Sequence, residues 1–331
     1  MLLELSTVYS ERSAQTHMKS LFLAALILAS GALQWEEKAK MPLPRAGYMA
    51  GAVSRRLLLA GGSHWTNGKK LWSNRADFFD PSSNQWSPAP PLPDERSDAA
   101  SVSVNGVLYL FGGGAGDTVR RDALAFESGR WKAIPGATLP SPRLYAVAAS
   151  LGTRIYLSGG IKEAGKYESA VNDFLVWDTA KPKSGWQALP PVPGKPRFVH
   201  ALAGYQGKVY VFGGAAAGPP DVANLGDAYV FDPATKQWTT LPDLPQKRRA
   251  WGSAELGGSL YLLGGYTNTY ETEVYRFDSA SGKLHPAGAL PHPYCAAIFV
   301  NLNGSIVVAG GETADRVRAP WTLIGNARDE R

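Results

Sequence analysis

Cysteine is nearly absent from this sequence of 331 residues, in which Cys295 stands alone. An internal disulfide is therefore excluded, and so are the paired cysteines of a structural zinc site or a redox dithiol. Histidine is almost as scarce, with 5 residues, and none stands among carboxylates at the spacing of metal ligands. We therefore expect no metal and no other cofactor, and a fold that is held together by packing alone.

Long apolar runs are also lacking. The run near the N-terminus, LFLAALILA at 21–29, has about 9 residues, where a membrane span needs about 20. A lysine precedes this run and the small residues Ser-Gly-Ala follow it, which is typical of a secretory signal peptide. We expect residues 1–32 to be an upstream extension plus this signal. The mature protein should then be periplasmic or secreted, with no membrane association after cleavage.

Charge of neither sign is concentrated in one segment. The formal net charge is +6, from 34 Lys and Arg against 28 Asp and Glu, yet no stretch is basic enough to indicate a nucleic-acid or lipid surface. This excess favours a small anion as ligand over a polyanion. The sequence also lacks a glycine-rich phosphate loop and a nucleophile elbow, so neither kinases, dehydrogenases nor hydrolases are indicated.

Glycine, by contrast, is abundant and recurs in pairs. Double glycines stand 46 to 54 residues apart, at Gly61-Gly62, Gly112-Gly113, Gly159-Gly160, Gly213-Gly214, Gly264-Gly265 and Gly310-Gly311. This period is typical of kelch-type propeller blades. Each pair follows a short apolar run, such as LYLFGG or VYVFGG, as expected for a strand that is buried between two stacked blades. Six pairs predict an all-β fold, a six-bladed kelch-type β-propeller.

Tryptophans mark the outer strand of each predicted blade. Trp86, Trp131, Trp186 and Trp238 each stand shortly before a proline-rich segment, and Trp35 matches them near the start of the chain. The last blade lacks such a strand of its own. We therefore expect residues 33–40 to complete that blade and close the ring, which limits exposed strand edges. The propeller would span residues 33–325, followed by a polar tail at 326–331.

An arginine begins most of the predicted blades, and we call it the leading arginine. Five of the six blades have it, at Arg45, Arg96, Arg143, Arg197 and the pair Arg248-Arg249, and Tyr294 takes its place in the sixth. Pseudo-symmetry would direct several of these guanidinium groups, among them Arg45, Arg143, Arg197 and Arg249, to one mouth of the channel, where they could bind a carboxylate or phosphate. The alternative is that each pairs with a carboxylate within its blade.

Two segments resemble a particular kelch family. The loop that contains Gly68-Lys69-Lys70 and Trp72, and the segment Gly310 to Arg318 (GGETADRVR), are similar to parts of the N-acetylneuraminate epimerases or mutarotases, including cyclically permuted members. The resemblance implies a glutamate and an arginine at the catalytic site, which correspond here to Glu312 and Arg318. It also implies a small acidic sugar as substrate.

The residue after each double glycine should lie near the axis. These residues are Ser63, Gly114, Ile161, Ala215, Tyr266 and Glu312, and of the six only Glu312 ionises near neutral pH. A carboxylate there can transfer the proton that sugar ring opening requires. Arg318 is then its partner or the anchor of the substrate carboxylate, and His64 and Trp65 line the same mouth. Otherwise Glu312 forms a structural ion pair, and His64 and Trp65 pack within their loop.

Two functions follow from these patterns. The first is an exported isomerase, a mutarotase that interconverts the anomers of sialic acid or a similar acidic sugar. The second is a non-catalytic kelch propeller that binds a protein or glycan through its loop face, since the fold alone does not determine the activity. Glu312 distinguishes them, because a binding module has no need for one carboxylate among five neutral positions.

Overall fold

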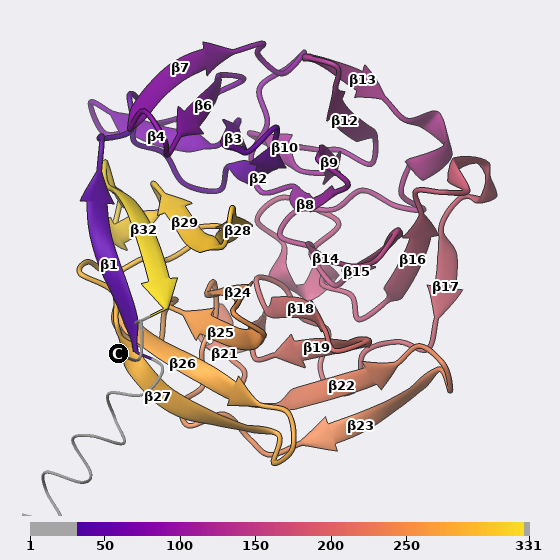
Figure 1. Cartoon of the computed structure of the whole chain (residues 1–331). Helices are drawn as coiled ribbons and strands as arrows, with labels where there is room; N and C mark the ends of the chain where they lie inside the picture. Colours follow the sequence, from indigo (N-terminus) through magenta and orange to yellow (C-terminus); the bar gives the residue numbers. More distant parts are fainter. Residues whose placement is uncertain (1–31, 328–331) are drawn as a thin grey trace, which may run out of the picture.

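Six antiparallel sheets of four strands each surround a central axis in the computed structural model, which describes residues 32–327 (Figure 1). The predicted six-bladed propeller is therefore confirmed. The segment expected to be a signal peptide lies outside the described residues, apart from residue 32. Within the described part, no helix is long and apolar enough to cross a membrane.

The strands of each blade follow one another from the axis outward. Blade one contains β2 (Met49–Val53), β3 (Arg56–Ala60), β6 (Ala76–Asp80) and β7 (Gln85–Ala89). Blade two contains β8 (Ala100–Val104), β9 (Val107–Phe111), β12 (Ala123–Glu127) and β13 (Arg130–Ala133). Blade three contains β14 (Val147–Leu151), β15 (Arg154–Ser158), β16 (Phe174–Asp178) and β17 (Gln187–Leu189).

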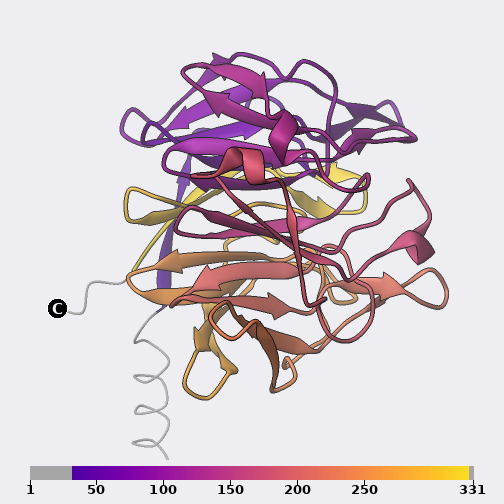
Figure 2. The ribbon, with the colours of Figure 1, turned by 90° about the vertical axis from the view of Figure 1, so that its right-hand side faces the viewer.

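The other three blades repeat this order, and Figure 2 shows successive blades as layers of the ring. Blade four contains β18 (Ala201–Tyr205), β19 (Lys208–Phe212), β22 (Ala228–Asp232) and β23 (Gln237–Leu241). Blade five contains β24 (Gly252–Leu256), β25 (Ser259–Leu263), β26 (Glu273–Asp278) and β27 (Lys283–Ala289). Blade six contains β28 (Val300–Leu302), β29 (Ser305–Ala309) and β32 (Thr322–Ala327), and its outer strand is β1 (Leu33–Lys38).

The ring is closed by a strand from the N-terminal part of the chain. β1 pairs with β32 in antiparallel register from Leu33↔Ala327 to Lys38↔Thr322, and the two strands lie side by side in Figure 1. Without β1, the backbone edge of β32 would be exposed. The expected closure by residues 33–40 is thus confirmed, with the strand ending at Lys38.

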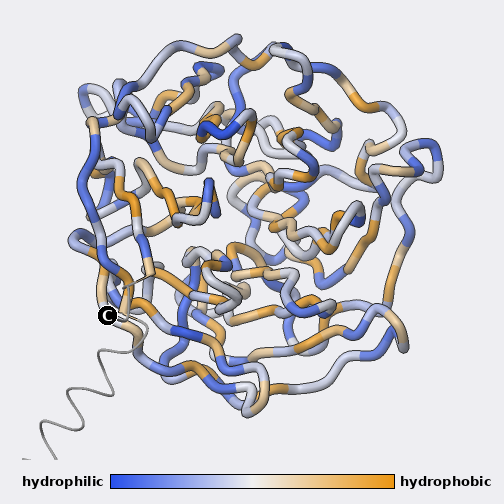
Figure 3. The backbone as a smooth tube through the Cα atoms, viewed as in Figure 1, coloured by the Kyte–Doolittle hydropathy of each residue, from blue (hydrophilic) through white to orange (hydrophobic). Residues whose placement is uncertain are grey.

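The second strand of each blade is the most apolar. In β3, β9, β15, β19, β25 and β29, almost every residue is buried, because both faces of the strand pack against neighbouring blades. The outer strands consist mostly of exposed and partly buried residues. Figure 3 shows hydrophobic segments within the ring and hydrophilic segments along much of its circumference.

The double glycines occur where one blade packs against the next. A side chain at Gly213, whose φ is +54°, would place its Cβ 2.5 Å from the carbonyl oxygen of Arg248, the leading arginine of the following blade. The amide of Gly214 donates a hydrogen bond of 2.8 Å to that same oxygen. Only glycine tolerates this approach together with a left-handed backbone. The other five pairs have the same relationship to the next blade.

Four of the outer tryptophans connect neighbouring blades at the rim. Each donates a hydrogen bond of 2.7 to 2.9 Å from Nε1 to a backbone carbonyl just beyond the outer strand of the preceding blade. The pairs are Trp86 with Ala39, Trp131 with Pro90, Trp186 with Ala137 and Trp238 with Pro190. The repeated tryptophan therefore stabilises blade packing at the circumference.

Candidate functional site

A closed ring of backbone hydrogen bonds surrounds the axis, and we call it the throat. One residue from each blade takes part, and its amide donates to the carbonyl of the equivalent residue in the preceding blade, over distances of 2.7 to 3.4 Å. The six throat residues are Gly47, Asp98, Tyr145, Val199, Ala250 and Ala296. All six have positive φ values between 44° and 62°, a conformation that is unusual for residues other than glycine. The ring therefore fixes strained backbone around the axis.

A cavity of about 630 Å³ extends along the axis from this throat. The six throat residues form part of its wall, and the innermost strands of the blades line the rest. Asp98 is the only throat residue with a carboxyl group. A ligand in the channel would therefore meet a single carboxyl group at the throat.

Short hairpins rise from the same face of the ring, directly after the double glycines of four blades. They are β4 (Ser63–Thr66) with β5 (Lys69–Trp72), β10 (Gly114–Ala115) with β11 (Thr118–Val119), β20 (Ala215–Ala217) with β21 (Val222–Asn224), and β30 (Glu312–Ala314) with β31 (Val317–Arg318). The first residue of each hairpin forms a bridge with the residue after the leading position, for example Cys295↔Glu312. This pairing holds the hairpins close to the throat.

Glu312 and Arg318 are cross-strand neighbours in the hairpin of blade six. Arg318 donates from Nη1 to Glu312 Oε1 and from Nε to the backbone oxygen of Ser63, the latter over 3.1 Å. The Arg318 side chain is 7% exposed and that of Glu312 is 28% exposed. Both hydrogen bonds hold the guanidinium in place, and the carboxylate of Glu312 remains partly accessible at the mouth.

The blade-one hairpin, which contains His64 and Trp65, lies beside this pair. The guanidinium carbon of Arg316 lies 4.9 Å from the centre of the Trp65 ring, which joins the two hairpins by a cation–π contact. His64 is half-buried, and its Nδ1 atom has no hydrogen-bond partner among the described residues.

Three of the predicted anion-binding arginines are enclosed in the blades. Arg45, Arg143 and Arg197 are at most 1% exposed, and they form ion pairs with Asp77, Asp173 and Asp227. Arg96 and Arg248 are buried in the same way, beside Asp122 and Glu273. The expectation that Arg45, Arg143 and Arg197 face the mouth is therefore wrong. Each guanidinium binds a carboxylate that lies within the third strand of its blade or directly precedes that strand.

Arg249 differs from the leading arginines. It is partly exposed at the position that alanine, serine, leucine, phenylalanine or cysteine takes in the other blades, and it pairs with Tyr266 as an isolated bridge. Its guanidinium lies 4.4 Å from the centre of the Tyr266 ring and donates a 2.8 Å hydrogen bond to Asn224. Within residues 32–327, no carboxylate lies at ion-pair distance from Arg249. Its charge is thus available to an anionic ligand.

Asp98 is a candidate site residue that the sequence prediction missed. Its Oδ2 accepts a 2.7 Å hydrogen bond from the Ser97 hydroxyl, and its Oδ1 lies so close to Gly47 that a Cβ there would be 2.3 Å away. Burial raises the pKa of Asp98, and the charge of Glu312 raises it further, whereas Lys70, Ser97 and Arg318 lower it. The repeat pattern could have indicated it, because Asp98 is the only acidic residue two positions after a leading residue.

Tyrosine and cysteine side chains complete the surroundings of the two carboxylates. The charge of Asp98, followed by burial and the charge of Glu312 among the lesser causes, raises the pKa of the Tyr145 hydroxyl. Burial and then the nearby Glu312 raise the pKa of Tyr270 to about 12 and that of the Cys295 thiol to about 12. These three groups therefore stay protonated at neutral pH. Among residues 32–327, no cluster of histidine, cysteine and carboxylate side chains is placed to hold a metal ion.

Comparisons with known proteins agree with this architecture. The family described as the KLHDC2/KLHL20/DRC7 Kelch-repeats domain matches residues 47–252, which is more than half of the chain. Kelch-like protein 35 of Mus musculus is 26% identical over 237 residues, covering 71% of this chain and 38% of that protein. Kelch-like protein terF of Aspergillus terreus is 32% identical over 202 residues, covering 58% of this chain and 43% of that protein. The chain thus spans less than half the length of these relatives.

A solved structure has the same fold. The structure titled "Structure of YjhT" superposes with a TM-score of 0.71 at 16% sequence identity, and the match covers 88% of this chain and 97% of that one. At this level of identity the likeness concerns the arrangement of the blades. The chemistry at the mouth therefore has to be inferred from the residues of this chain.

Proposed function

Because the chain belongs to the kelch-repeat domain family, whose propellers present loops around a central channel, we propose that its mouth binds a small acidic sugar and interconverts its anomers. The proposed activity is that of a mutarotase or epimerase for N-acetylneuraminate or a similar sugar acid. The observation that carries this proposal is the Glu312–Arg318 pair, a partly exposed carboxylate fixed by an arginine beside the throat.

Glu312 would act as the proton-transfer group. Anomer exchange requires that a proton leave the anomeric hydroxyl, that the bond between the anomeric carbon and the ring oxygen break, and that the ring oxygen gain a proton. A positioned carboxylate supports such a step by general acid–base catalysis. Arg318 holds the Glu312 side chain in place through the hydrogen bond from its Nη1 atom.

The second requirement is recognition of the sugar carboxylate. Arg318 already donates to Glu312 and to Ser63, whereas Arg249 has only the neutral Asn224 and the face of Tyr266 as partners. A planar guanidinium can bind a carboxylate through two parallel hydrogen bonds. Arg249 is therefore the better anchor for the acidic group, and Trp65 offers a flat apolar surface to the sugar ring.

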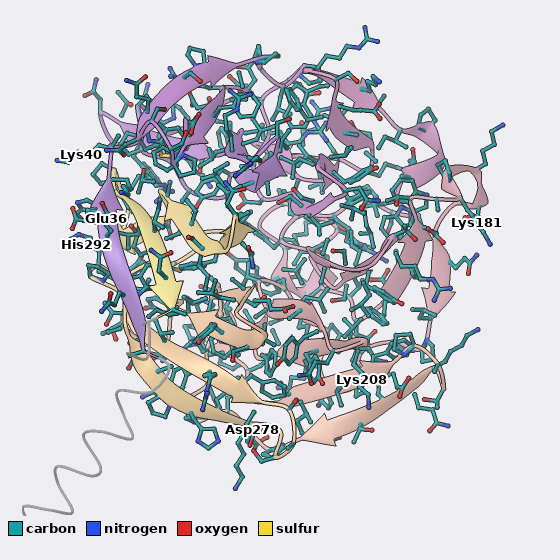
Figure 4. All side chains as sticks on the ribbon, in the orientation of Figure 1. Glu36, Lys40, Lys181, Lys208, Asp278 and His292 are labelled. Carbon is teal, nitrogen blue, oxygen red and sulfur yellow. The ribbon has the colours of Figure 1, made fainter. Side chains whose placement is uncertain are left out.

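Export is part of the same proposal. The basic, apolar and small-residue segments at 18–32 suit a cleavable secretory signal, so a periplasmic or secreted location would bring the mouth into contact with free sugar acids. Charged side chains such as Glu36, Lys40 and Lys181 lie on the outer circumference of the ring, away from the axis (Figure 4). Their distribution suits a surface that faces water.

A second function is favoured by a different observation. Leu71 and Val317 are 42% and 50% exposed, and both lie on the hairpins beside the mouth. Exposed apolar groups at the tips of loops suit the docking of a protein or glycan. The mouth would then be the binding surface of a non-catalytic kelch propeller, with the Glu312–Arg318 pair as a structural contact.

One experiment separates the two functions. Purified protein is mixed with freshly dissolved α-N-acetylneuraminate, and the approach to anomeric equilibrium is followed by proton NMR. A mutarotase accelerates this approach in proportion to protein concentration. A binding module leaves the rate at that of buffer, and it should instead shift amide resonances of the hairpins when glycans or candidate partner proteins are titrated.

A further inference from the structure

We propose that Asp98 is the second proton-transfer group of the site, and that it serves the ring oxygen of the bound sugar while Glu312 serves the anomeric hydroxyl. This inference rests on the proposed function and extends it from one carboxylate to two. Asp98 belongs to blade two and Glu312 to blade six, and the ring of blades brings them within electrostatic reach of each other. The Asp98 carboxylate lies against Gly47, and the preceding residue, Ala46, bridges to Ser63, whose carbonyl accepts from Arg318.

The position of Asp98 supports this role. Its backbone is locked in the throat by two hydrogen bonds, from its amide to Gly47 and from the amide of Tyr145 to its own carbonyl. Gly47 has no side chain, which leaves room for the carboxyl group directly over its Cα atom. The side chain is therefore placed by rigid backbone, which is what a proton-transfer group needs.

One carboxyl oxygen remains for a ligand. Ser97 occupies Oδ2, whereas no group within the described residues donates a hydrogen bond to Oδ1. Asp98 is enclosed by protein but still partly accessible from the channel, whose cavity it lines. Burial favours the protonated form of this carboxyl group, which can itself donate to a ligand oxygen.

The charged and titratable groups around Asp98 come from three other blades. Lys70 of blade one and Arg318 of blade six act on it as cations, Glu312 of blade six acts as an anion, and Tyr145 of blade three is a neutral neighbour. Burial outweighs the two cations and raises the pKa of Asp98. Two carboxyl groups in different environments can take opposite protonation states, one neutral acid and one ionised base.

The reaction then balances without any further reagent. Ionised Glu312 accepts the proton of the anomeric hydroxyl, a carbonyl forms at the anomeric carbon, and the bond to the ring oxygen breaks as neutral Asp98 donates its proton to that oxygen. Rotation about the adjacent carbon–carbon bond presents the other face of the carbonyl. Asp98 then recovers its proton from the hydroxyl, which attacks, and Glu312 returns its proton to the new anomeric oxygen.

The decisive variant is Asp98→Asn, with Asp117→Asn as its matched control. Asn keeps the shape and the neutral charge that the site favours, but it cannot transfer a proton. Asp117 lies exposed in the turn of the blade-two hairpin, on the same face. We expect Asp98→Asn to lower anomer exchange by about 10²- to 10⁴-fold. We also expect it to remove the decline of the rate with rising pH, since that decline reports loss of the acidic proton.

A second measurement does not depend on catalysis. Carbon-13 NMR of the labelled aspartate carboxyl groups identifies Asp98 by its absence in Asp98→Asn, and its titration is followed with and without N-acetylneuraminate. We expect the sugar to raise the midpoint of the Asp98 titration, because the ligand oxygen accepts a hydrogen bond from the neutral acid. The resonance of Asp117 should not respond.

The outcomes separate this inference from the function on which it rests. Suppose that wild type accelerates exchange, that Asp98→Asn keeps the full rate, and that the sugar does not change the titration of Asp98. The two-carboxylate inference is then wrong, and the mutarotase proposal stands. If nothing accelerates exchange but the sugar shifts the Asp98 titration, the enzyme proposal is wrong and Asp98 remains a ligand-binding group without a proton-transfer role. If neither response occurs, both are wrong.

Discussion

Arg318 lies directly opposite Glu312 in the β30–β31 hairpin and donates from Nη1 to the Glu312 carboxylate. The short loop between the two strands reverses the chain so that residues six apart in sequence become cross-strand partners. Because Arg318 also donates to the backbone of Ser63, it connects blade six to blade one at the mouth. One arginine thereby positions the candidate proton-transfer group and joins the two hairpins that flank it.

Replacement of Arg249 should weaken the binding of acidic ligands and leave the binding of neutral ligands unchanged. Arg249→Ala removes a guanidinium that has no carboxylate partner in the described chain, so binding of N-acetylneuraminate should weaken by about 1.5 to 3 kcal/mol, the range for hydrogen bonds to charged groups. Isothermal titration calorimetry measures this change. Arg130→Ala, at an exposed outer strand, is the control and should leave affinity unchanged. Equal affinity for the acidic sugar in Arg249→Ala and wild type would rule out the anchor.

Replacement of Arg45 should instead affect stability. Arg45 and Asp77 are both fully buried, so Arg45→Ala removes one of the two ion-pair partners of a buried carboxylate and leaves a cavity, at an expected cost of about 3 to 5 kcal/mol in the free energy of unfolding. Arg75, which also binds Asp77, should keep the loss toward the lower end. Urea denaturation measures it, and Arg130→Ala should stay within about 0.5 kcal/mol of wild type. If Arg45→Ala were as stable as wild type but weaker in ligand binding, the structural role assigned here would be incorrect.

The closing strand can be tested at Trp35. This side chain packs over Gly325 of β32, where an added Cβ would lie 2.5 Å from the Trp35 ring. Trp35→Ala should lower the free energy of unfolding by about 3 to 5 kcal/mol, whereas Gln34→Ala, exposed on the same strand, should have little effect. Deletion of 33–40 should uncover the edge of β32 and cause aggregation. A monomeric deletion variant with an unchanged Tm would contradict the closure.

The pH dependence of stability should reflect His200. This residue is buried, with Nε2 at 2.6 Å from the Ser158 hydroxyl, and burial, followed by the charge of Arg197, holds its pKa well below the usual value. In the unfolded chain, His200 takes up a proton near pH 6.5, whereas in the folded chain it stays neutral at that pH. The free energy of unfolding therefore falls as the pH drops below about 6.5. For one such histidine, the free energy of unfolding changes by at most about 1.4 kcal/mol per pH unit. His200→Asn should show a shallower decline in Tm between pH 7.5 and pH 5, and parallel curves for the two proteins would disprove the assignment.

Much of the architecture follows from the repeat pattern in the sequence. The double glycines, the apolar strands and the tryptophans predict six blades and the closing strand, because each reflects a local packing requirement that recurs in every blade. The leading arginines were misassigned for the same reason. A residue that repeats in five blades usually satisfies a need of the blade, and here that need is the carboxylate beside the third strand.

The site follows from departures from the repeat. Glu312 was predicted because it is the only charged residue directly after a double glycine. Arg249 is the charged exception one residue after the leading residue, and Asp98 is the exception two residues after it. The proximity of Asp98 and Glu312 could not be inferred from spacing, because they lie in different blades and meet only through the ring. Whether an arginine pairs with a carboxylate inside its blade or faces the channel likewise depends on side-chain packing, which the sequence alone does not show.

The most direct test of the proposed function is the rate of anomer exchange in wild type and in Glu312→Gln, with Glu163→Gln as control. Glu163 pairs with Lys166 on an exposed loop of blade three, so its replacement preserves the site. Proton NMR of freshly dissolved α-N-acetylneuraminate gives the rate, calorimetry checks that binding persists, and circular dichroism checks folding. We predict acceleration by wild type and by Glu163→Gln, and a fall of about 10²- to 10⁴-fold in Glu312→Gln. A wild-type rate equal to that of buffer would contradict the proposed activity, and a full rate in Glu312→Gln would contradict the assigned site.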